Sequence, residues 1–472
     1  MKRINKSIYI LFALVVLLSG CEKFDGSLNV DPNRPTKASG TQLIANAEMF
    51  LPDMSSSPFG VHYPQHLSNT SFTDNSRYTT VNFNFYGLYT GPLMNLETVL
   101  TSTLDANEGP IVNQVAVAKI LKAFFYWHMT DRWGDIPYSE ALKGKDNFTP
   151  KYDRQQDIYN SLFALLDEAN AAIVTGNIKN DIVYNGDVAK WKKLGNTIHL
   201  LMALRLSKVD AVKGAAEFNK AITNGIMTAN TDNLAYPHLA EQPNENFWYN
   251  QFTRLGRNWY AVSKPLVDYM KPLNDPRLPV FANKNTAGEY VGLDYGLPGS
   301  TTVVINNFSL LGSGIRLQNS PVSLVTYAQA LFARAEAAKL GWITGGDAVV
   351  KTNYDSAIQQ SIRQWAGPDA DITTYLAKPG VLYEPANAIR QIATQRWVHL
   401  FLNGYEAWAE WRRTGFPVLV AAPGANGDKI PRREGYPVQD RANNATNYNA
   451  AVSAFPYGGT DDLNARVWWD KP

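Results

Sequence analysis

The stretch VNQVAVAKILKAFFYWHMTDRWGDIPY, residues 112–138, decides the fold. Its apolar side chains recur at spacings of three and four through residue 130, which predicts a long helix that is apolar nearly all round. Gly134 can stop this helix by adopting a left-handed conformation, and Asp135 can accept hydrogen bonds from nearby backbone amides. Pro137 then prevents continuation. We therefore expect a buried helix at the centre of the fold.

The same periodicity recurs along the chain and predicts an all-α fold. Three pairs of helices are expected: 112–130 with 157–173, 188–206 with 211–223, and 327–340 with 353–365. Further helices are expected over 259–270 and over 389–411, the last interrupted near Gly404. Strand signals are sparse, and the best lies at 301–305. Paired helices with small alanines at packing positions resemble tetratricopeptide-like hairpins.

Four long segments between the helices lack periodicity: 59–94, 228–258, 272–321 and 417–472. Loops this long inside a compact domain are usually functional or form their own subregion. We therefore expect a helical scaffold with long irregular loops that build a ligand-binding subregion.

Composition excludes several classes of protein. The 472 residues carry 44 Lys+Arg against 42 Asp+Glu, so the net charge of +2 gives no footprint for a nucleic-acid partner. A hydrophobic fraction of 45% with 18% charged residues excludes a disordered tail. The single cysteine excludes a disulfide framework and a cysteine-rich zinc site.

That one cysteine lies directly after a targeting pattern. Basic residues at positions 2, 3 and 6 precede an apolar run over 8–18, which suits a signal peptide and is short for a membrane-spanning helix. The sequence LSGC at 18–21 resembles the lipobox of bacterial lipoproteins, in which the cysteine is acylated and becomes the mature N-terminus. The alternative is an ordinary signal peptide with an incidental cysteine.

The lipobox resemblance implies three parts: a signal peptide over 1–20, a lipidated tether over 21–40 with the lipid on Cys21, and a binding domain over 41–472. No other segment is long and apolar enough to span a bilayer, so the lipid would be the membrane attachment. Glu22 and Asp25 resemble the acidic signal that sends some lipoproteins to the cell exterior.

Several strings of residues carry a more specific resemblance. They are NVDPN at 29–33, RWGDIPY at 132–138, WKKLGN at 191–196, NDPRL at 274–278, and NGYEAW at 403–408 followed by WRRTGFP at 411–417. In this order behind a lipobox, they resemble the SusD/RagB-like nutrient-binding outer-membrane lipoproteins. The resemblance extends to about residue 420.

The resemblance implies a scaffold of four tetratricopeptide-like units, with no catalysis and no cofactor. Members capture glycan fragments, or in some cases peptides, at the cell surface. They cap a SusC-like TonB-dependent transporter in the outer membrane, which performs the uptake. We therefore expect an outer-membrane, lipid-anchored protein that binds an oligosaccharide or peptide and delivers it to such a transporter.

Carbohydrate binding needs flat apolar surface for sugar C–H faces, together with amide or charged groups for the hydroxyls. Two loops offer both, and a glycine-rich stretch offers a third candidate. The predicted binding residues are Arg77, Tyr78, Phe83, Phe85 and Tyr86 in the first loop, Asn246, Trp248, Tyr249, Asn250, Arg257 and Trp259 in the second, and Tyr290 and Tyr295 in the third. The alternative is that these rings anchor the loops onto the helices, which is the stronger interpretation for any single ring.

No HExxH, GxSxG or phosphate-loop motif is present. His62 and His66 are four apart, but Pro64 lies between them, so we expect no metal there. Asp275 and Pro276 favour a turn, and Arg277 is expected to pair with a carboxylate in a structural role. The pair Arg412-Arg413 near Glu406 and Glu410 is expected to form an ion network on a helix face. His128, His199 and His399 are expected in the core or at helix interfaces.

Two functions from other classes remain open. A helical glycoside hydrolase would need a pair of carboxylates on the walls of a pocket, for which Glu245 or Asp294 are weak candidates. A scaffold that binds only proteins would not need the aromatic residues of the loops.

Overall fold

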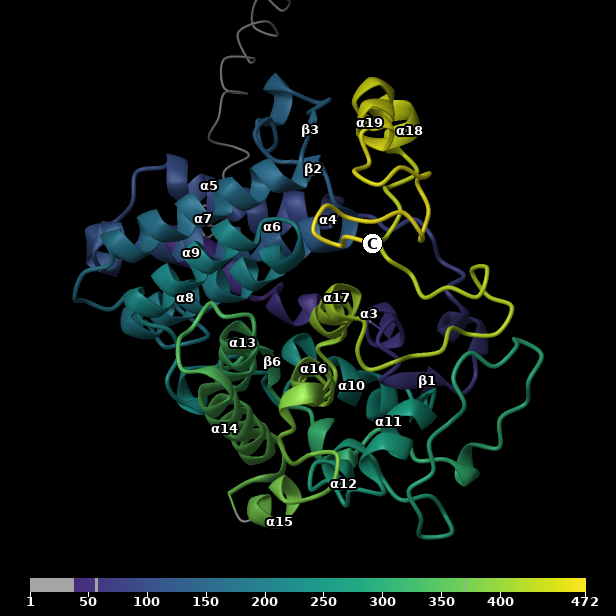
Figure 1. Cartoon of the computed structure of the whole chain (residues 1–472). Coiled ribbons are helices and arrows are strands. Elements are labelled where there is room, and N and C mark those ends of the chain that lie inside the picture. Colours follow the sequence, from purple (N-terminus) through teal and green to yellow (C-terminus); the bar gives the residue numbers. More distant parts are fainter. Residues whose placement is uncertain (1–37, 56–57, 369) are drawn as a thin grey trace, which may run out of the picture.

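The computed structural model describes residues 38–55, 58–368 and 370–472 (Figure 1). The predicted signal peptide, Cys21 and nearly all of the predicted tether lie outside the described residues. The longer helices are α2 (Gly40–Glu48), α5 (Met94–Thr101), α6 (Ile111–Trp133), α7 (Gln155–Ala172), α8 (Val188–Arg205), α9 (Ala211–Asn224), α13 (Tyr327–Lys339), α14 (Gly346–Ala366), α16 (Ala388–His399), α17 (Gly404–Thr414) and α19 (Ala445–Ser453).

Short helices and three small sheets complete the fold. The short helices are α3 (Pro58–His62), α4 (Tyr86–Leu88), α10 (Phe247–Tyr249), α11 (Lys264–Met270), α12 (Leu278–Phe281), α15 (Ile372–Leu376) and α18 (Asp440–Asn443). The strands pair antiparallel as β1 (Leu67–Asn69) with β5 (Tyr260–Val262), β2 (Ile136–Pro137) with β3 (Tyr152–Asp153), and β4 (Leu234–Tyr236) with β6 (Val322–Val325).

The central helix is confirmed. Helix α6 runs three residues beyond the predicted end and stops at Gly134, whose φ of 82° is the positive value that a glycine tolerates. The carboxylate of Asp135 accepts a hydrogen bond from the backbone N–H of Gln155 at 2.8 Å. Since Gln155 begins α7, the turn after α6 also fixes the start of its partner helix.

The paired helices are confirmed as well. Helices α6 and α7, α8 and α9, and α13 and α14 pack against each other, and α16 packs against α17 (Figure 1). The predicted interruption near Gly404 separates α16 from α17. A Cβ at Gly404 would lie 2.3 Å from the carbonyl group of Gly60, so only glycine lets α17 begin this close to α3. The fold is the expected all-α scaffold of tetratricopeptide-like hairpins.

Two predictions of secondary structure were wrong. The segment 259–270 begins as strand β5, and α11 starts only at Lys264. An earlier start would place Pro265 inside the helix, whereas in the first turn its missing N–H breaks no hydrogen bond. The predicted strand at 301–305 is irregular chain leading into a 3-10 turn, and Val304 is exposed, because this β-branched stretch does not join a sheet.

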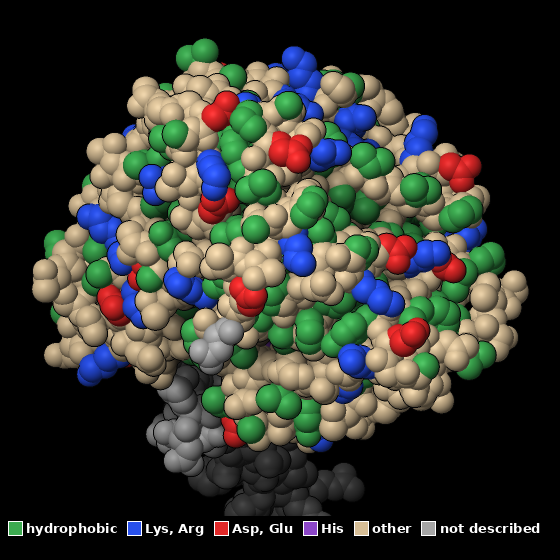
Figure 2. Space-filling view, turned by 60° about the horizontal axis from the view of Figure 1, so that its bottom comes forward, with side chains coloured by type: hydrophobic (Ala, Val, Ile, Leu, Met, Phe, Trp, Pro, Cys, Tyr) green, Lys and Arg blue, Asp and Glu red, His purple; other side chains and the backbone are tan. Residues whose placement is uncertain are grey.

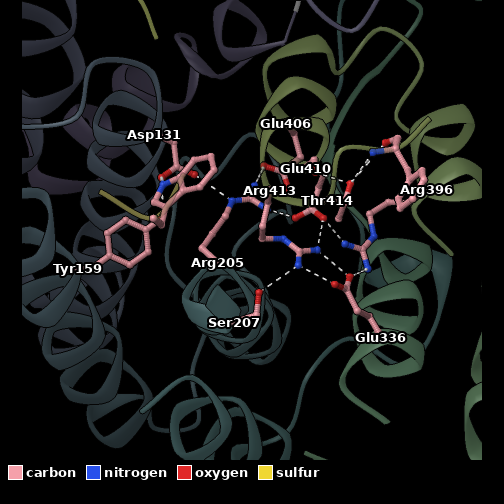
Figure 3. Close-up of polar contacts among 12 residues, drawn as sticks. Asp131, Tyr159, Arg205, Ser207, Glu336, Arg396, Glu406, Glu410, Arg413 and Thr414 are labelled. Atoms are coloured by element: carbon pink, nitrogen blue, oxygen red, sulfur yellow. Dashed lines mark hydrogen bonds and ion pairs between the residues drawn. The ribbon is translucent and has the colours of Figure 1, made fainter. Parts of the chain in front are cut away.

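A network of buried charged side chains joins the helices of the scaffold (Figure 3). On α8, Arg205 donates to Asp131 of α6 at 3.1 Å and to Glu406 of α17 at 2.6 Å. The same guanidinium group pairs with Glu410, one turn further along α17. Three helices that are distant in sequence therefore meet at Arg205.

The network continues to two more arginines. Glu410 also pairs with Arg396 on α16 and with Arg413 on its own helix. Glu336 on α13 accepts from Arg413 at 2.6 and 2.7 Å and from Arg396 at 3.0 Å. These two arginines and Glu336 have at most 4% of their side chains exposed, so the charges depend on each other for stabilisation.

The ion network expected around Arg412-Arg413 is only partly as predicted. Arg413 pairs with Glu410, but Arg412 donates to the backbone carbonyl of Asp131 at 2.7 Å and lies over the Trp408 ring at 3.7 Å. The partner of Glu406 is Arg205, and the whole group is buried rather than spread along an exposed helix face. Arg277 has the expected structural role, and the carboxylate with which it pairs, at 2.6 Å and fully buried, is that of Asp275.

Replacing Glu336 by Gln should destabilise the fold strongly. The change leaves Arg396 and Arg413 buried with one carboxylate fewer, and breaking a buried ion pair in this way costs about 3–5 kcal/mol. Urea unfolding measures the loss. The control is Glu168→Gln, which removes the exposed pair with Lys119 and should cost less than about 1 kcal/mol. Equal losses in both variants would contradict a structural role for the network.

The contribution of Glu336 should also depend on pH. Burial raises its pKa, but Arg413 and Arg396 outweigh burial and bring the pKa to about 2, below the ordinary 4.5. A lowered pKa means that the stabilisation is complete above about pH 4.5 and is lost as the pH falls toward 2. The difference in unfolding free energy between wild type and Glu336→Gln should therefore shrink below pH 4.5. A difference that stays constant down to pH 3 would refute this assignment.

Candidate functional site

The predicted binding residues occupy several separate places in the structure. Tyr78 is only 5% exposed and packs against Tyr63 and Tyr295, with ring centroids 6.2 Å apart in each case. The hydroxyl of Tyr295 donates to the backbone carbonyl of His62 at 2.5 Å. Tyr78 is therefore buried in the core, Tyr295 is half-buried against it, and both rings anchor their loops.

Arg77 ties three loops together. Its guanidinium group donates to the carbonyl oxygens of Gly296 at 2.9 Å and Pro423 at 2.8 Å. Asp74 lies 3.8 Å away and balances the charge. The Nη1 group of Arg77 is therefore used to hold loops in place.

The other aromatics of the first loop lie toward α18. Phe83 packs edge-on against Phe59, and Phe85 is buried. The hydroxyl of Tyr86 donates to Asp440 at the start of α18. Phe85 and Tyr86 line a mainly apolar cavity of about 420 Å³ beside α18, together with the exposed Phe148.

The second loop divides into a buried and an exposed part. Asn246 caps α10, since its side chain accepts from the Trp248 N–H at 2.8 Å and donates to the Ser320 carbonyl at 2.9 Å. Trp248 is only 2% exposed, although with Asn246 it borders a cavity of about 250 Å³. Tyr249 is half-buried beside it, and the Asn250 side chain donates to Glu245 at 2.9 Å.

The exposed part forms a surface of different character. The Trp259 ring meets the Phe72 ring edge to face with centroids 4.8 Å apart, and the Arg257 guanidinium lies over Trp259 at 4.5 Å. Phe72 is 54% exposed. We call these three residues the aromatic platform.

The β1–β5 ladder explains why two loops far apart in sequence build this platform. Asn69 pairs with Tyr260, and the next residue outward, Thr70, donates from its N–H to the Trp259 carbonyl at 2.8 Å. The Asn69 side chain then accepts from the N–H groups of Ser71 and Phe72 at 3.0 and 2.6 Å. This side-chain turn sets Phe72 beside Trp259.

Polar groups lie beside the platform. A 3-10 turn over Thr73–Arg77 follows Phe72 directly and carries Asp74 and Arg77. The Thr73 hydroxyl donates to the Pro298 carbonyl at 2.8 Å, which brings the loop around 298 to the same place. A Cβ on Gly299 would lie 2.3 Å from the Asp74 carboxylate, so glycine permits this close approach. Aromatic surface beside carboxylate and guanidinium groups suits a polyhydroxylated ligand.

Of the predicted residues, the structure brings Arg257 and Trp259 together on this platform. Sequence reasoning missed Phe72, which precedes the first predicted cluster by five positions. In the sequence SNTSFTDN at 68–75, Phe72 is the only aromatic residue among small polar residues, and no alternation marks a face. Tyr290 lies apart, with the Lys284 ammonium 5.7 Å from its ring.

The histidines show no metal-binding geometry. His62 bonds through Nδ1 to the Leu67 carbonyl at 3.0 Å, and His66 through Nε2 to the Trp397 carbonyl at 3.0 Å. Burial lowers the pKa of His62 to about 4 and of His66 to about 3, so both are neutral at pH 7. In the part of the chain that the structure describes, no group of three or more potential metal ligands occurs.

Charge on the surface is mixed. On the face shown in Figure 2, Lys and Arg side chains alternate with Asp and Glu and form no large patch of one sign. Such a face does not favour a polyanion such as nucleic acid. Among the described helices, none has the length and apolar character needed to cross a bilayer.

The burial of the two tryptophans predicts different mutant behaviour. Trp248→Ala should lower the free energy of unfolding by about 3–5 kcal/mol, as expected when a buried tryptophan is truncated. Trp259→Ala should cost much less, because part of its ring already faces water. Denaturant unfolding of both variants tests this. A Trp248→Ala protein as stable as the wild type would contradict a core role for Trp248 and favour its predicted role as a ligand contact.

Comparisons with known proteins agree with the fold and geometry. A family model described as "Starch-binding associating with outer membrane" matches residues 32–437. No curated protein matches the chain. A chitin-binding protein of known structure is 31% identical, with a TM-score of 0.80 over 92% of this chain and 98% of its own.

Two further solved structures share the architecture. A SusD homolog from Bacteroides fragilis is 26% identical, with a TM-score of 0.79 over 92% of this chain and 100% of its own. A chitin-binding SusD homolog from Flavobacterium johnsoniae is 23% identical with a TM-score of 0.76, covering 92% of this chain and 98% of its own, and supports the fold alone. With the family model matched over most of its length, the chain belongs to the SusD-like family of outer-membrane-associated proteins.

Proposed function

We propose that this protein is a surface lipoprotein that captures an oligosaccharide on the aromatic platform. The observation that carries the proposal is the exposed Phe72 ring packed against the half-buried Trp259 ring, with the Arg257 guanidinium over the indole. Sugar rings present C–H faces that pack on aromatic rings, while their hydroxyls bond to charged groups at the edge. The starch and chitin named for the family model and for a relative support a glycan as the ligand class.

The platform suits ligand binding without catalysis. Of the carboxylates nominated for a hydrolase, Glu245 is held by Arg254 at 2.5 and 2.6 Å, and these hydrogen bonds lower its pKa to about 2. A general acid needs the opposite shift. Asp294 is exposed and paired with Lys264 at 3.2 Å. Neither carboxylate has the environment of a glycosidase acid, so we favour capture over hydrolysis.

Membership of the family supports the remaining parts of the proposal. The lipid on Cys21 would hold the protein at the outer membrane, facing the cell exterior. The domain over 41–472 would pass its ligand to a SusC-like TonB-dependent transporter. Tagged protein should therefore co-purify with such a transporter from detergent-solubilised membranes, and Cys21→Ala should release it from the membrane fraction.

Truncating either ring of the platform should weaken glycan binding. Phe72→Ala and Trp259→Ala should each reduce affinity for chito- or malto-oligosaccharides by about tenfold, since each removes a stacking surface. Isothermal calorimetry measures the change. Phe148→Ala is the matched control, because Phe148 is an 81% exposed aromatic beside the α18 cavity, away from the platform.

Three outcomes separate the hypotheses. Binding that survives in both platform variants would reject the platform as the site. Binding of peptides but no oligosaccharide, with the same dependence on Phe72 and Trp259, would assign the peptide alternative. Release of shorter sugars from any bound glycan would favour the hydrolase.

A further inference from the structure

A third hollow is lined by Trp411 in the last turn of α17, by residues 419–432 and by Asn464 and Arg466 near the C-terminus. Its volume is about 480 Å³, and none of the predicted ligand residues lines it. Its lining combines apolar, amide and cationic side chains, namely those of Trp411, Leu419, Lys429, Arg432, Asn464 and Arg466. We call this hollow the basic pocket.

A buried carboxylate holds two of these cations at the pocket wall. The Asp470 side chain is fully buried and accepts from Arg432 Nε at 2.8 Å and from Arg466 Nη1 at 3.1 Å. Arg432 and Arg466 nevertheless keep 17% and 30% of their side chains exposed. One carboxylate therefore orients two guanidinium groups and neutralises only one of them.

Lys429 adds a third cation. Among the described residues, the ion pairs at this pocket are those of Asp470, and the Lys429 side chain is exposed. The carboxylate that lines the pocket, Asp428, accepts from the Gly424 N–H at 2.6 Å. Three cations against two carboxylates leave one surplus positive charge.

Two cations of the pocket also act on a neighbouring lysine. Lys208, one turn after α8, has its pKa lowered, first by burial and then by the Arg413 guanidinium group, with Arg432 and Arg466 adding to the effect against Asp470. Cations in this region therefore repel each other, and an anion placed in the basic pocket would relieve that repulsion.

The pocket also offers apolar surface. The Trp411 indole N–H donates to the Pro417 carbonyl at 3.1 Å, which fixes the ring, and Arg432 lies 5.1 Å from its centroid. Leu419 and Ile430 line the same hollow. An indole with aliphatic neighbours suits the C–H face of a sugar ring, as on the platform.

We propose that the basic pocket binds an oxyanion carried on a sugar ring. Arg466 and Lys429 would make charge-assisted hydrogen bonds to the oxyanion, while Trp411 and Leu419 contact the ring. Two sources share this chemistry, the carboxylate of a uronic acid in a glycan and the phosphate of a phosphorylated sugar. A neutral sugar would gain only the apolar contact, so the pocket would select for charge.

Calorimetry with purified protein tests the proposal with two probes, trigalacturonic acid and glucose 6-phosphate. At least one should bind, and Lys429→Gln and Arg466→Gln should each weaken that binding about tenfold, as expected for a charge-assisted hydrogen bond. Raising the salt concentration should weaken it as well. Lys145→Gln, which changes an exposed lysine beside the α18 cavity, is the matched control and should leave affinity unchanged.

The outcomes divide as follows. A loss confined to trigalacturonic acid assigns a uronate of a glycan, and a loss confined to glucose 6-phosphate assigns a sugar phosphate. Failure of both probes to bind, or unchanged affinity in both variants at equal thermal stability, overturns the proposal. Trp259→Ala should leave binding of these probes intact, so failure of the platform and failure of the basic pocket give different results.

Discussion

Glu410 accepts from three arginines on three helices, and the arrangement of the scaffold depends on this contact. Arg205, Arg396 and Arg413 come from α8, α16 and α17, and Glu336 on α13 binds two of them from the other side. Apolar packing tolerates small shifts between helices, whereas buried charges must keep their partners within hydrogen-bonding distance. The network therefore fixes how the helical hairpins pack on one another, and this packing positions the loops that carry the platform.

The helices of the three predicted pairs could be predicted because each leaves a local periodic signal, whereas α2, α5 and α19 were not predicted, the last lying in a segment expected to lack periodicity. Helix α6 was predicted to within three residues at its C-terminal end, and Gly404 marked the break between α16 and α17. Strands β1 and β5 could not be predicted, because a strand of three residues is too short to show an alternating pattern. Their pairing also joins positions nearly two hundred residues apart. The predicted strand at 301–305 shows the converse, since strand-favouring residues form no strand without a partner.

The site was harder to predict than the fold, because composition does not reveal exposure. Trp248 and Trp259 lie in the same loop and have the same chemistry, yet Trp248 is fully buried in the core and Trp259 is only half-buried. Tyr78 and Tyr295 anchor loops, as the alternative interpretation of single rings held. No local pattern in the sequence pointed to Phe72. Its contact with Trp259 depends on the pairing of β1 with β5 and on the Asn69 side-chain turn.

The platform differs from the cavities in having no walls. Its rings lie next to the ends of two short strands, and the turn over Thr73–Arg77 follows Phe72 directly. A chain molecule resting there keeps one side in contact with water along its length, and neither of its ends is sterically marked. If the proposed site binds a glycan, such a surface would accept the interior of a polymer as readily as its terminus, and the ligand could leave sideways without any part of the protein having to open.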